Sequence, residues 1–355
     1  MPDFRSDNTH GCSPEILEAI ARASAGTQTS YGGDEYTARV RRRCCEIFEI
    51  DVEIFPVVSG TAGNALAIAA LTPAWGAVFC HEDAHIQRDE CGAPEFFSGG
   101  AKLIPIAGAA GKLHPDDLTC AIQTVVESKR TAVPACVSIT NATEAGTVYS
   151  VPEMQALCGA GNPAGGPRLR IHLDGARFAN AVAATGASPA DLTWRAGVDL
   201  LTFGATKNGA LAAEAIVVFD KSLAEEIALR HHRSGHRISK MRFISAQLDA
   251  YLTGDLWLRN ARHANAMAQR LARGLTTIHP TIHPVDANVL FVRFSPEQAA
   301  ALRENGFLFA NWSIFGDDAY RLVTAFDTTA DQVDAFLREA SGLRPRTSDG
   351  YASEA

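Results

Sequence analysis

Apolar runs rich in β-branched residues alternate with segments of helical periodicity between Ile54 and Phe219. Short apolar runs bounded by turn residues favour strands. The runs that predict strands cover residues 54–58, 77–80, 102–106, 132–139, 169–173, 200–203 and 215–219. Helical periodicity marks residues 35–48, 61–71 and 115–128, after a first helix that begins at Ser13-Pro14-Glu15. Strands that alternate with helices predict an α/β fold with a mostly parallel sheet covered by helices on both faces.

The pattern changes after about residue 250. A long helical stretch runs from Ile244 to about Leu275, and it is followed by strand 289–294, helix 296–305, strand 320–324 and helix 330–340. This order is typical of an α+β unit. We therefore predict a large domain at residues 1–250, which includes an N-terminal arm, and a small domain at 251–343. The polar tail at 344–355 is expected to be disordered.

Composition narrows the possible partners. The chain has 355 residues and a net charge of -8, which argues against a nucleic-acid partner. Its longest apolar stretch, Ala65 to Leu71, is too short to span a bilayer, and the first ten residues contain no signal-peptide core. The eight cysteines include no CxxC pair and are expected to be reduced thiols. We therefore expect a cytoplasmic protein with a small-molecule substrate.

Lys207 is the first residue that suggests chemistry. A predicted strand ends at Phe203, and the chain then turns through small residues to this lysine. Ligands of open α/β sheets bind beyond the carboxyl ends of strands. A lysine held there among uncharged neighbours can lose its proton and act as an amine nucleophile. Without further signals, however, it could equally be an ordinary loop lysine.

Asp174 ends the preceding predicted strand, and Arg177 follows three residues later. An aspartate near a lysine at neighbouring strand ends suits pyridoxal phosphate (PLP), because an acidic partner keeps the ring nitrogen of this cofactor protonated. The arginine offers a planar fork of donors for a carboxylate. Asp174 would otherwise be interpreted as the N-cap of the following helix.

Ser59, Gly60 and Thr61 form a turn between a predicted strand and a predicted helix. The free N–H groups of such a helix start attract a phosphate. Many helices begin with similar residues, so this turn is a weak signal by itself. The chain has neither a Walker lysine motif nor a GxGxxG motif.

His85 follows the strand predicted at 77–80 and could stack on a cofactor ring. The segment His81-Glu82-Asp83-Ala84-His85 also matches the HExxH pattern of zinc proteases. That pattern binds zinc only on a helix, where the two histidines share one face. Here the segment directly follows a strand-like run and is predicted to be a loop, so we expect no metal site.

Together, these elements and their order resemble the L-threonine aldolases, including the low-specificity and phenylserine aldolase types. The resemblance extends from Asp3 to about Leu337. It is carried by the segments Phe4-Arg5-Ser6-Asp7-Asn8, Tyr31-Gly32-Gly33-Asp34, Ser59-Gly60-Thr61, Ala84-His85-Ile86, His172-Leu173-Asp174-Gly175-Ala176-Arg177, Thr206-Lys207 and Tyr320-Arg321-Leu322.

The resemblance implies a fold-type I PLP enzyme with a sheet of the seven-stranded type. Lys207 would hold the cofactor as a Schiff base, and Ser6, Arg177 and Arg321 would bind the α-carboxylate of the substrate. Members of the family are homo-oligomers with active sites between subunits, and we expect a tetramer rather than a dimer. Arg242 of a neighbouring subunit would reach the phosphate, and Tyr31 would approach the site across the same interface.

The chain departs from its family at Glu144. Many relatives carry a histidine at about this position, near the β-hydroxyl group of the substrate. Glu144 itself, or His85 acting through water, could accept the hydroxyl proton here. A carboxylate that only caps a turn is the alternative interpretation of Glu144.

The expected reaction is retro-aldol cleavage of threonine, allo-threonine, phenylserine or a related β-hydroxy-α-amino acid to glycine and an aldehyde. A β-eliminating lyase or an aminotransferase on the same scaffold is the nearest alternative. More distant alternatives are a zinc peptidase that uses His81 and His85, and an inactive binding protein of this fold.

Overall fold

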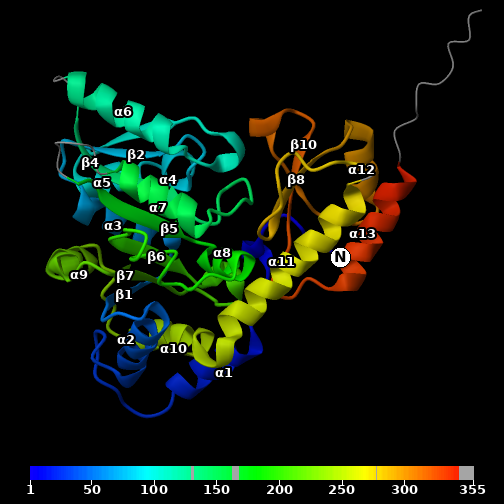
Figure 1. Ribbon diagram of the computed structural model, residues 1–355. Helices are drawn as coiled ribbons and strands as arrows, with labels where there is room; N and C mark the ends of the chain where they lie inside the picture. Colours follow the sequence, from blue (N-terminus) through cyan, green and yellow to red (C-terminus); the bar gives the residue numbers. More distant parts are fainter. Residues whose placement is uncertain (129–131, 162–167, 277, 344–355) are drawn as a thin grey trace, which may run out of the picture.

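A seven-stranded sheet forms the centre of the molecule (Figure 1). The computed structural model describes residues 1–128, 132–161, 168–276 and 278–343, so the predicted disordered tail lies outside the described residues. The strand order is β1-β7-β6-β5-β4-β2-β3. The strands are β1 (Glu53–Val57), β2 (Gly76–His81), β3 (Lys102–Ile106), β4 (Val133–Thr140), β5 (Arg170–Gly175), β6 (Leu200–Gly204) and β7 (Glu214–Val218).

The predicted mostly parallel sheet is confirmed, with one reversed strand. Strands β3, β2, β4, β5 and β6 pair in parallel, whereas β7 pairs antiparallel with both β6 and β1. Because β1 also opposes β7, it points the same way as the parallel strands. The carboxyl ends of these six strands and the first residue of β7 therefore meet at one edge of the sheet.

Alternating residues of the strands pack on opposite faces of the sheet. In β2, for example, Val78 and Cys80 belong to one core cluster and Phe79 to the other. The first cluster is completed by α3 (Gly60–Leu71) and α9 (Ala224–Arg233). The other face is covered by α1 (Pro14–Ala23), α2 (Glu35–Phe48), α6 (Pro115–Ser128), α7 (Val151–Ala160), α8 (Phe178–Thr185) and α10 (Arg242–Tyr251).

Helix α3 lies unusually close to the sheet. A Cβ atom added to Gly63 would stand 2.5 Å from Cγ2 of Thr202 in β6, so this position has no room for a side chain. Most other residues of the helix are apolar and buried. This close packing positions the start of α3 at the sheet edge where the strand ends meet.

The C-terminal part forms a small antiparallel sheet in the order β8-β10-β9. It consists of β8 (Val289–Arg293), β9 (Ala310–Asn311) and β10 (Ala319–Val323), with α12 (Pro296–Glu304) and α13 (Ala330–Gly342). The N-terminal arm joins this unit, because Phe4 is buried in its core and its backbone bonds to Leu308 and Val323. The boundary near residue 250 stays a prediction.

The single helical stretch predicted from Ile244 to Leu275 is wrong. Helix α10 ends at Tyr251, and α11 (Leu256–Leu275) begins after a 3-10 turn. Within that turn Gly254 and Asp255 have φ angles of 58° and 57°, which no continuous helix allows. The helical periodicity of the sequence continues on both sides of the turn, so the sequence pattern did not reveal the break. Figure 1 shows α11 running from the sheet domain to the small domain.

Two short helices follow β2: α4 (His85–Arg88) and α5 (Ala93–Ser98). The sequence pattern predicted neither of them, nor did it predict α7, α8 or α9. Among the described residues, every helix is too short or too polar to cross a membrane.

Candidate active site

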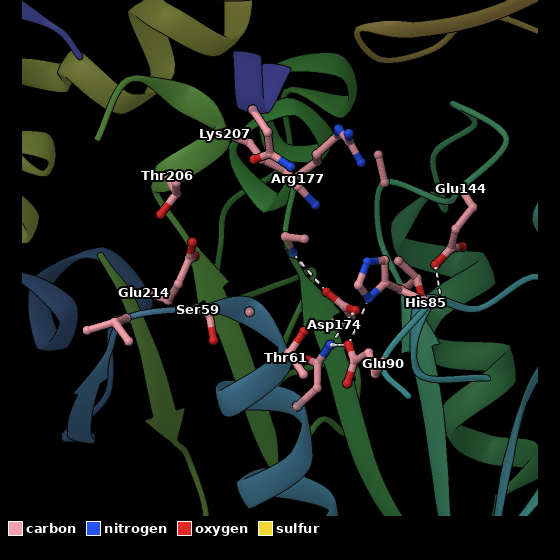
Figure 2. Close-up of a pocket in the computed structure, with 17 residues that line it drawn as sticks. Ser59, Thr61, His85, Glu90, Glu144, Asp174, Arg177, Thr206, Lys207 and Glu214 are labelled. Carbon is pink, nitrogen blue, oxygen red and sulfur yellow. Dashed lines mark hydrogen bonds and ion pairs between the residues drawn. The ribbon is translucent and has the colours of Figure 1, made fainter. Parts of the chain in front are cut away.

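A cavity of about 250 Å³ opens at the edge where the strands end (Figure 2). Residues from several elements and the loops that follow them line it, including Ser59, Thr61, Asn64, His85, Glu90, Glu144, Asp174, Arg177, Thr206, Lys207 and Glu214. The expected position beyond the carboxyl ends of the strands is therefore confirmed. A second cavity of about 330 Å³ adjoins it and shares Asn8, His85, Glu144, Arg177 and Lys207.

Lys207 lies in the 3-10 helix Thr206–Asn208 that follows β6. The next residue anchors this turn, because Nδ2 of Asn208 donates hydrogen bonds to Tyr251 Oη and to the carbonyl of Trp257. Among the described residues, the ammonium group of Lys207 has no hydrogen-bond or ion-pair partner. Burial and the charge of Arg177 lower the pKa of Lys207, against the opposing effect of nearby carboxylates. The lysine is thus free to react as an amine.

Asp174 is buried at the end of β5 and is held on both carboxylate oxygens. Its Oδ1 accepts the Ala176 N–H at 2.9 Å, and its Oδ2 accepts Nδ2 of Asn64 at 2.8 Å. A carboxylate fixed in this way suits a cationic ring nitrogen better than it suits a helix cap. The interpretation of Asp174 as an N-cap side chain is not supported, because the helix that follows has Arg177 as its N-cap.

The Ser59–Thr61 turn forms the start of α3, as predicted. Ser59 Oγ accepts the Ala62 N–H at 3.2 Å and caps the helix. Among the described residues, the N–H groups of Gly60 and Thr61 have no acceptor. Both residues line the cavity, and a Cβ atom on Gly60 would meet nothing within 4 Å. The turn can therefore bind an anion.

His85 and Glu144 contact each other at the opposite wall. Glu144 Oε1 accepts the backbone N–H of His85 at 2.9 Å, whereas its Oε2 is shielded from solvent and has no partner among the described residues. Burial, together with the charge of Asp174, raises the pKa of Glu144 to about 7. A carboxyl group with this pKa can exchange a proton near neutral pH.

The geometry argues against a zinc peptidase. His81 is the last residue of β2 and His85 is the first of the four-residue helix α4, so the two rings do not share a helical face. Both nitrogens of His81 are also engaged: Nε2 bonds to the carbonyl of Gly108, and Nδ1 accepts the Asp83 N–H.

Arg177 is oriented by a residue that our sequence analysis did not single out. Its Nε and Nη2 donate to Asp7 at 2.8 and 2.9 Å, and Asp7 is only 3% exposed. Although burial acts to raise it, the charges of Arg177 and Lys207 lower the pKa of Asp7. The aspartate therefore stays ionised, and the remaining edge of the guanidinium is available to the cavity.

Ser6 and Arg321 line the adjoining cavity together with Arg177. Arg321 stacks on Trp312, with its Cζ 4.2 Å from the ring centroid, and donates to the carbonyl of Arg5. Among the described residues it has no carboxylate partner. Burial and the nearby charge of Arg177 lower the pKa of Arg321 to about 10. Two guanidinium groups in one cavity favour a bound carboxylate.

Tyr31 and Arg242 lie outside both cavities of the single chain. Tyr31 is 51% exposed, with a φ angle of 56°, and its N–H donates to the carbonyl of Ser239. Arg242 begins α10 and donates to the carbonyl of Gly26. Their expected roles depend on a second subunit and stay predictions.

Sequence reasoning gave no role to several polar residues of the site, which include Asp7, Asn64, Glu90 and Glu214. Asn64 is a polar residue inside an apolar helix, and Glu214 opens an otherwise apolar strand. Each was therefore visible as an exception to its pattern. Asp7 and Glu90 carry no comparable signal, because charged residues are common in loops.

Comparison with known proteins identifies the family. A family model described as beta-eliminating lyase matches residues 3–297. The chain belongs to the beta-eliminating lyase family. Within it, the low-specificity L-threonine aldolase of Pseudomonas aeruginosa is 41% identical over 341 residues, which cover 95% of this chain and 96% of that protein. The predicted resemblance is thereby confirmed.

Solved structures agree with this family. Leishmania major threonine aldolase matches with a TM-score of 0.90 and 27% identity, covering 97% of this chain and 99% of that one. An aspartate aminotransferase from Rhodobacter sphaeroides matches with a TM-score of 0.71 and 18% identity over 97% and 93% of the chains, which shows the shared fold alone. Threonine aldolases and beta-eliminating lyases of this fold are PLP-dependent lyases.

The cavity residues fit PLP. An unpaired lysine, a buried aspartate and the open N–H groups of Gly60 and Thr61 supply the three kinds of contact that this cofactor needs: a covalent anchor, a partner for the ring nitrogen and a phosphate cradle.

Proposed function

We propose that the chain is a PLP-dependent aldolase that cleaves L-threonine, L-allo-threonine or related β-hydroxy-α-amino acids such as phenylserine to glycine and an aldehyde. The observation that carries this proposal is the pair of adjoining cavities. Lys207 lies in the wall that both cavities share. Asp174 lines the first cavity, and Arg321, which has no carboxylate partner among the described residues, lines the second. An amino acid could thus be held by its carboxylate beside the reactive lysine.

Lys207 would anchor the cofactor, and Asp174 would face its ring nitrogen. The Ser59–Thr61 turn would bind its phosphate, and His85 would lie against its ring. Bound PLP supplies an electron-withdrawing ring that accepts the electron pair released when the Cα–Cβ bond breaks. The residues of the chain would bind and orient the cofactor and the substrate, and they would remove the β-hydroxyl proton.

The substrate carboxylate would be gripped by Ser6, Arg177 and Arg321. Because Asp7 fixes Arg177 and Trp312 supports Arg321, both guanidinium groups are preorganised. A fixed carboxylate determines which bond of Cα stands perpendicular to the ring, and hence which bond breaks. The same grip limits substrates to α-amino acids.

Glu144 is our choice for the base that takes the β-hydroxyl proton, in preference to His85 acting through water. Its Oε1 is held by the His85 backbone, and its free Oε2 remains available to a substrate hydroxyl. Loss of this proton turns the β-carbon into the carbonyl of the departing aldehyde. Cα then takes up a proton, which completes glycine.

We also propose a cytoplasmic homo-oligomer, with a tetramer favoured over a dimer. All eight cysteines are free, which suits a reducing compartment. The basic residues that the described chain contributes to the first cavity are His85, Arg177 and Lys207, and each is assigned to another role. Arg242 of a neighbouring subunit would supply the missing phosphate contact, with Tyr31 beside it.

The test is product analysis of the purified holoenzyme with threonine, allo-threonine and phenylserine. The proposal predicts equal amounts of glycine and aldehyde from at least one of them, and no product from Lys207→Ala. The variant Lys221→Ala, which changes an exposed lysine, should behave like the wild type. A keto acid without glycine would instead identify a β-eliminating lyase or an aminotransferase.

A further inference from the structure

Glu90 joins His85 to the aspartate of the site. Its Oε1 lies 2.8 Å from Nδ1 of His85 and also accepts Nδ2 of Asn64 at 2.8 Å. Asn64 in turn donates to Asp174. Figure 2 shows His85, Glu90 and Asp174 close together, and Asn64 of α3 bonds to both carboxylates. Four polar groups from three parts of the chain thus form one continuous network.

The carboxyl group of Glu90 is buried, and burial raises its own pKa, whereas the hydrogen bonds from His85 and Asn64 lower it. The residue is only 4% exposed, and its Oε2 has no hydrogen-bond partner among the described residues. No lysine or arginine of the described chain forms an ion pair with it. Burying a carboxyl group without a cationic partner is unfavourable, so a purely structural role would be costly. Of the two described side chains that bond to Glu90, Asn64 and His85, the imidazole is the one that can gain a positive charge.

The two hydrogen bonds to Oε1 also determine orientation. Because a carboxylate only accepts, Nδ1 of His85 must carry a proton and donate it to Glu90. The other ring nitrogen, Nε2, is then left for the cavity. Asn64 uses both hydrogens of its amide, one for Glu90 and one for Asp174, so the amide cannot turn without breaking the network. The bonds of Glu90 and Asn64 therefore fix both the orientation of the His85 ring and its tautomer.

Other charged groups also act on His85. Those that line the cavities beside it come from several elements: Asp174 in β5, Arg177 after β5, Lys207 after β6, Glu214 in β7, Glu144 after β4, Arg321 in β10, and Asp83, Arg88 and Asp89 in its own segment. Glu90 has the largest effect, and through its hydrogen bond it raises the pKa of His85. Asp174 acts in the same direction, whereas burial and Lys207 oppose it.

We propose that Glu90 is a positioning residue of the reaction, which orients the His85 ring and selects its Nδ1-protonated tautomer. The role in turnover rests on the proposed aldolase function. The contact between the two side chains does not, and it can be tested without substrate. His85 is the residue expected to lie against the cofactor, so Glu90 acts on the chemistry through it.

The matched variants are Glu90→Gln and Glu82→Gln. Glutamine keeps the size and one acceptor of Glu90 but removes its charge. Glu82 lies eight positions earlier in the same segment, is exposed, and has no ion-pair partner among the described residues, so its replacement removes the same charge without touching His85. Each protein is used as the full-length holoenzyme.

The first measurement follows the imidazole signals of ring-labelled histidine by NMR across pH. The chain has 11 histidines, and the His85 signal is assigned by its loss in His85→Asn. We expect Glu90→Gln to lower the titration midpoint of His85 by at least about one pH unit, since a carboxylate partner shifts a nearby group by that amount. Glu82→Gln should leave it in place. An unchanged midpoint in Glu90→Gln overturns the proposal.

The second measurement separates kcat from KM. A positioning role predicts that Glu90→Gln lowers kcat by roughly 10- to 100-fold, which is below the effect of removing an acid–base group itself. KM should change less than threefold, because Glu90 bonds to Asn64 and His85 and not to the residues proposed to bind the carboxylate. If Glu90→Gln changes only KM, or if Glu82→Gln lowers kcat equally, the role in turnover is overturned.

If the wild type releases no glycine, the aldolase proposal fails, and the NMR titration still decides the Glu90–His85 contact. If Glu90→Gln does not fold, Glu90→Asp should show an intermediate titration midpoint, and a wild-type midpoint there also overturns the proposal.

Discussion

Asp7 and Arg177 are 170 positions apart in the chain and are joined by two parallel hydrogen bonds inside the site. The pair is almost fully buried, and Nδ2 of Asn288 adds a third bond to Asp7. The N-terminal arm thus determines how an arginine of the sheet domain presents its free edge to the cavity. The proposed binding of the substrate carboxylate by Arg177 therefore depends on Asp7 as well as on the arginine.

Replacing Asp7 by Asn should weaken substrate binding and stability together. Arg177 would lose its ionic partner, so we expect KM for threonine to rise about tenfold or more, and the free energy of unfolding to fall by about 3 kcal/mol, as is usual when one partner of a buried ion pair is removed. Steady-state kinetics and urea unfolding measure the two effects. Asp3→Asn, which breaks an exposed pair with Arg5, is the control and should change each far less. An unchanged KM in Asp7→Asn would contradict the role of Asp7.

Glu144 should impose a pH dependence on turnover. A base must be deprotonated to act, and the pKa of Glu144 is raised to about 7. Activity should therefore rise as the pH increases through 7 and decline below it. Glu144→Gln should remove this dependence and lower kcat by about 100-fold or more. Glu127→Gln, at an exposed helix position, should retain the wild-type profile. Full activity of Glu144→Gln would transfer the role to His85.

A shared active site can be detected with two inactive variants. Lys207→Ala lacks the cofactor anchor, and Arg242→Ala should lack the phosphate contact from the neighbouring subunit. In an oligomer that contains both variants, one kind of site is intact. It combines Lys207 of the Arg242→Ala subunit with Arg242 of the Lys207→Ala subunit. Coexpression should restore about a quarter of wild-type activity if subunits associate at random in symmetric pairs. No recovery, with each variant inactive alone, would place Arg242 at the site of its own subunit or outside any site.

Glu214 should make the protein less stable as the pH rises toward neutrality. It lies in the first cavity, and its Oε2 accepts the Ala205 N–H. Burial raises its pKa from 4.5 to about 7, against the effect of bonds from Thr206. The folded state therefore holds the proton more tightly than the unfolded state, and stability falls between about pH 4.5 and pH 7 before levelling off.

Glu214→Gln should flatten that part of the stability curve. Glutamine keeps an acceptor for the Ala205 N–H but has no proton to lose. Urea unfolding of protein freed of PLP, measured at pH 5 and pH 8, gives the difference directly. Glu144 contributes in the same direction, so a partial loss of the slope is expected. A slope equal to that of the wild type would show that Glu214 keeps its usual pKa.

The anchoring residues were predictable because they follow strands. Asp174 and Lys207 come at or after the ends of consecutive apolar runs, and parallel strands bring such ends to one edge. Ser59 and His85 obey the same rule. Strand positions therefore predicted that these residues meet at one sheet edge, and all four line the first cavity. Their roles toward the cofactor stay predictions.

Residues that depend on long-range packing were not predictable in this way. The Asp7–Arg177 pair forms only when the N-terminal arm packs against the sheet domain, and no local sequence pattern predicts that contact. Glu214 enters the site because β7 runs against its neighbours, and an apolar run does not reveal its direction. The break before α11 was hidden for a different reason, since Gly254 and Asp255 interrupt a periodicity that continues on both sides.

The arm has one more consequence. Phe4 is buried in the core of the small domain and its backbone bonds to Leu308 and Val323, whereas Asp7, three residues later, is bonded to Arg177. Arg321 belongs to the same small sheet. The first seven residues therefore act as a tether between the sheet domain and the small domain. If Arg177 and Arg321 bind the substrate carboxylate as proposed, removing the arm should weaken that binding even though Lys207, Asp174 and the Ser59–Thr61 turn all lie elsewhere.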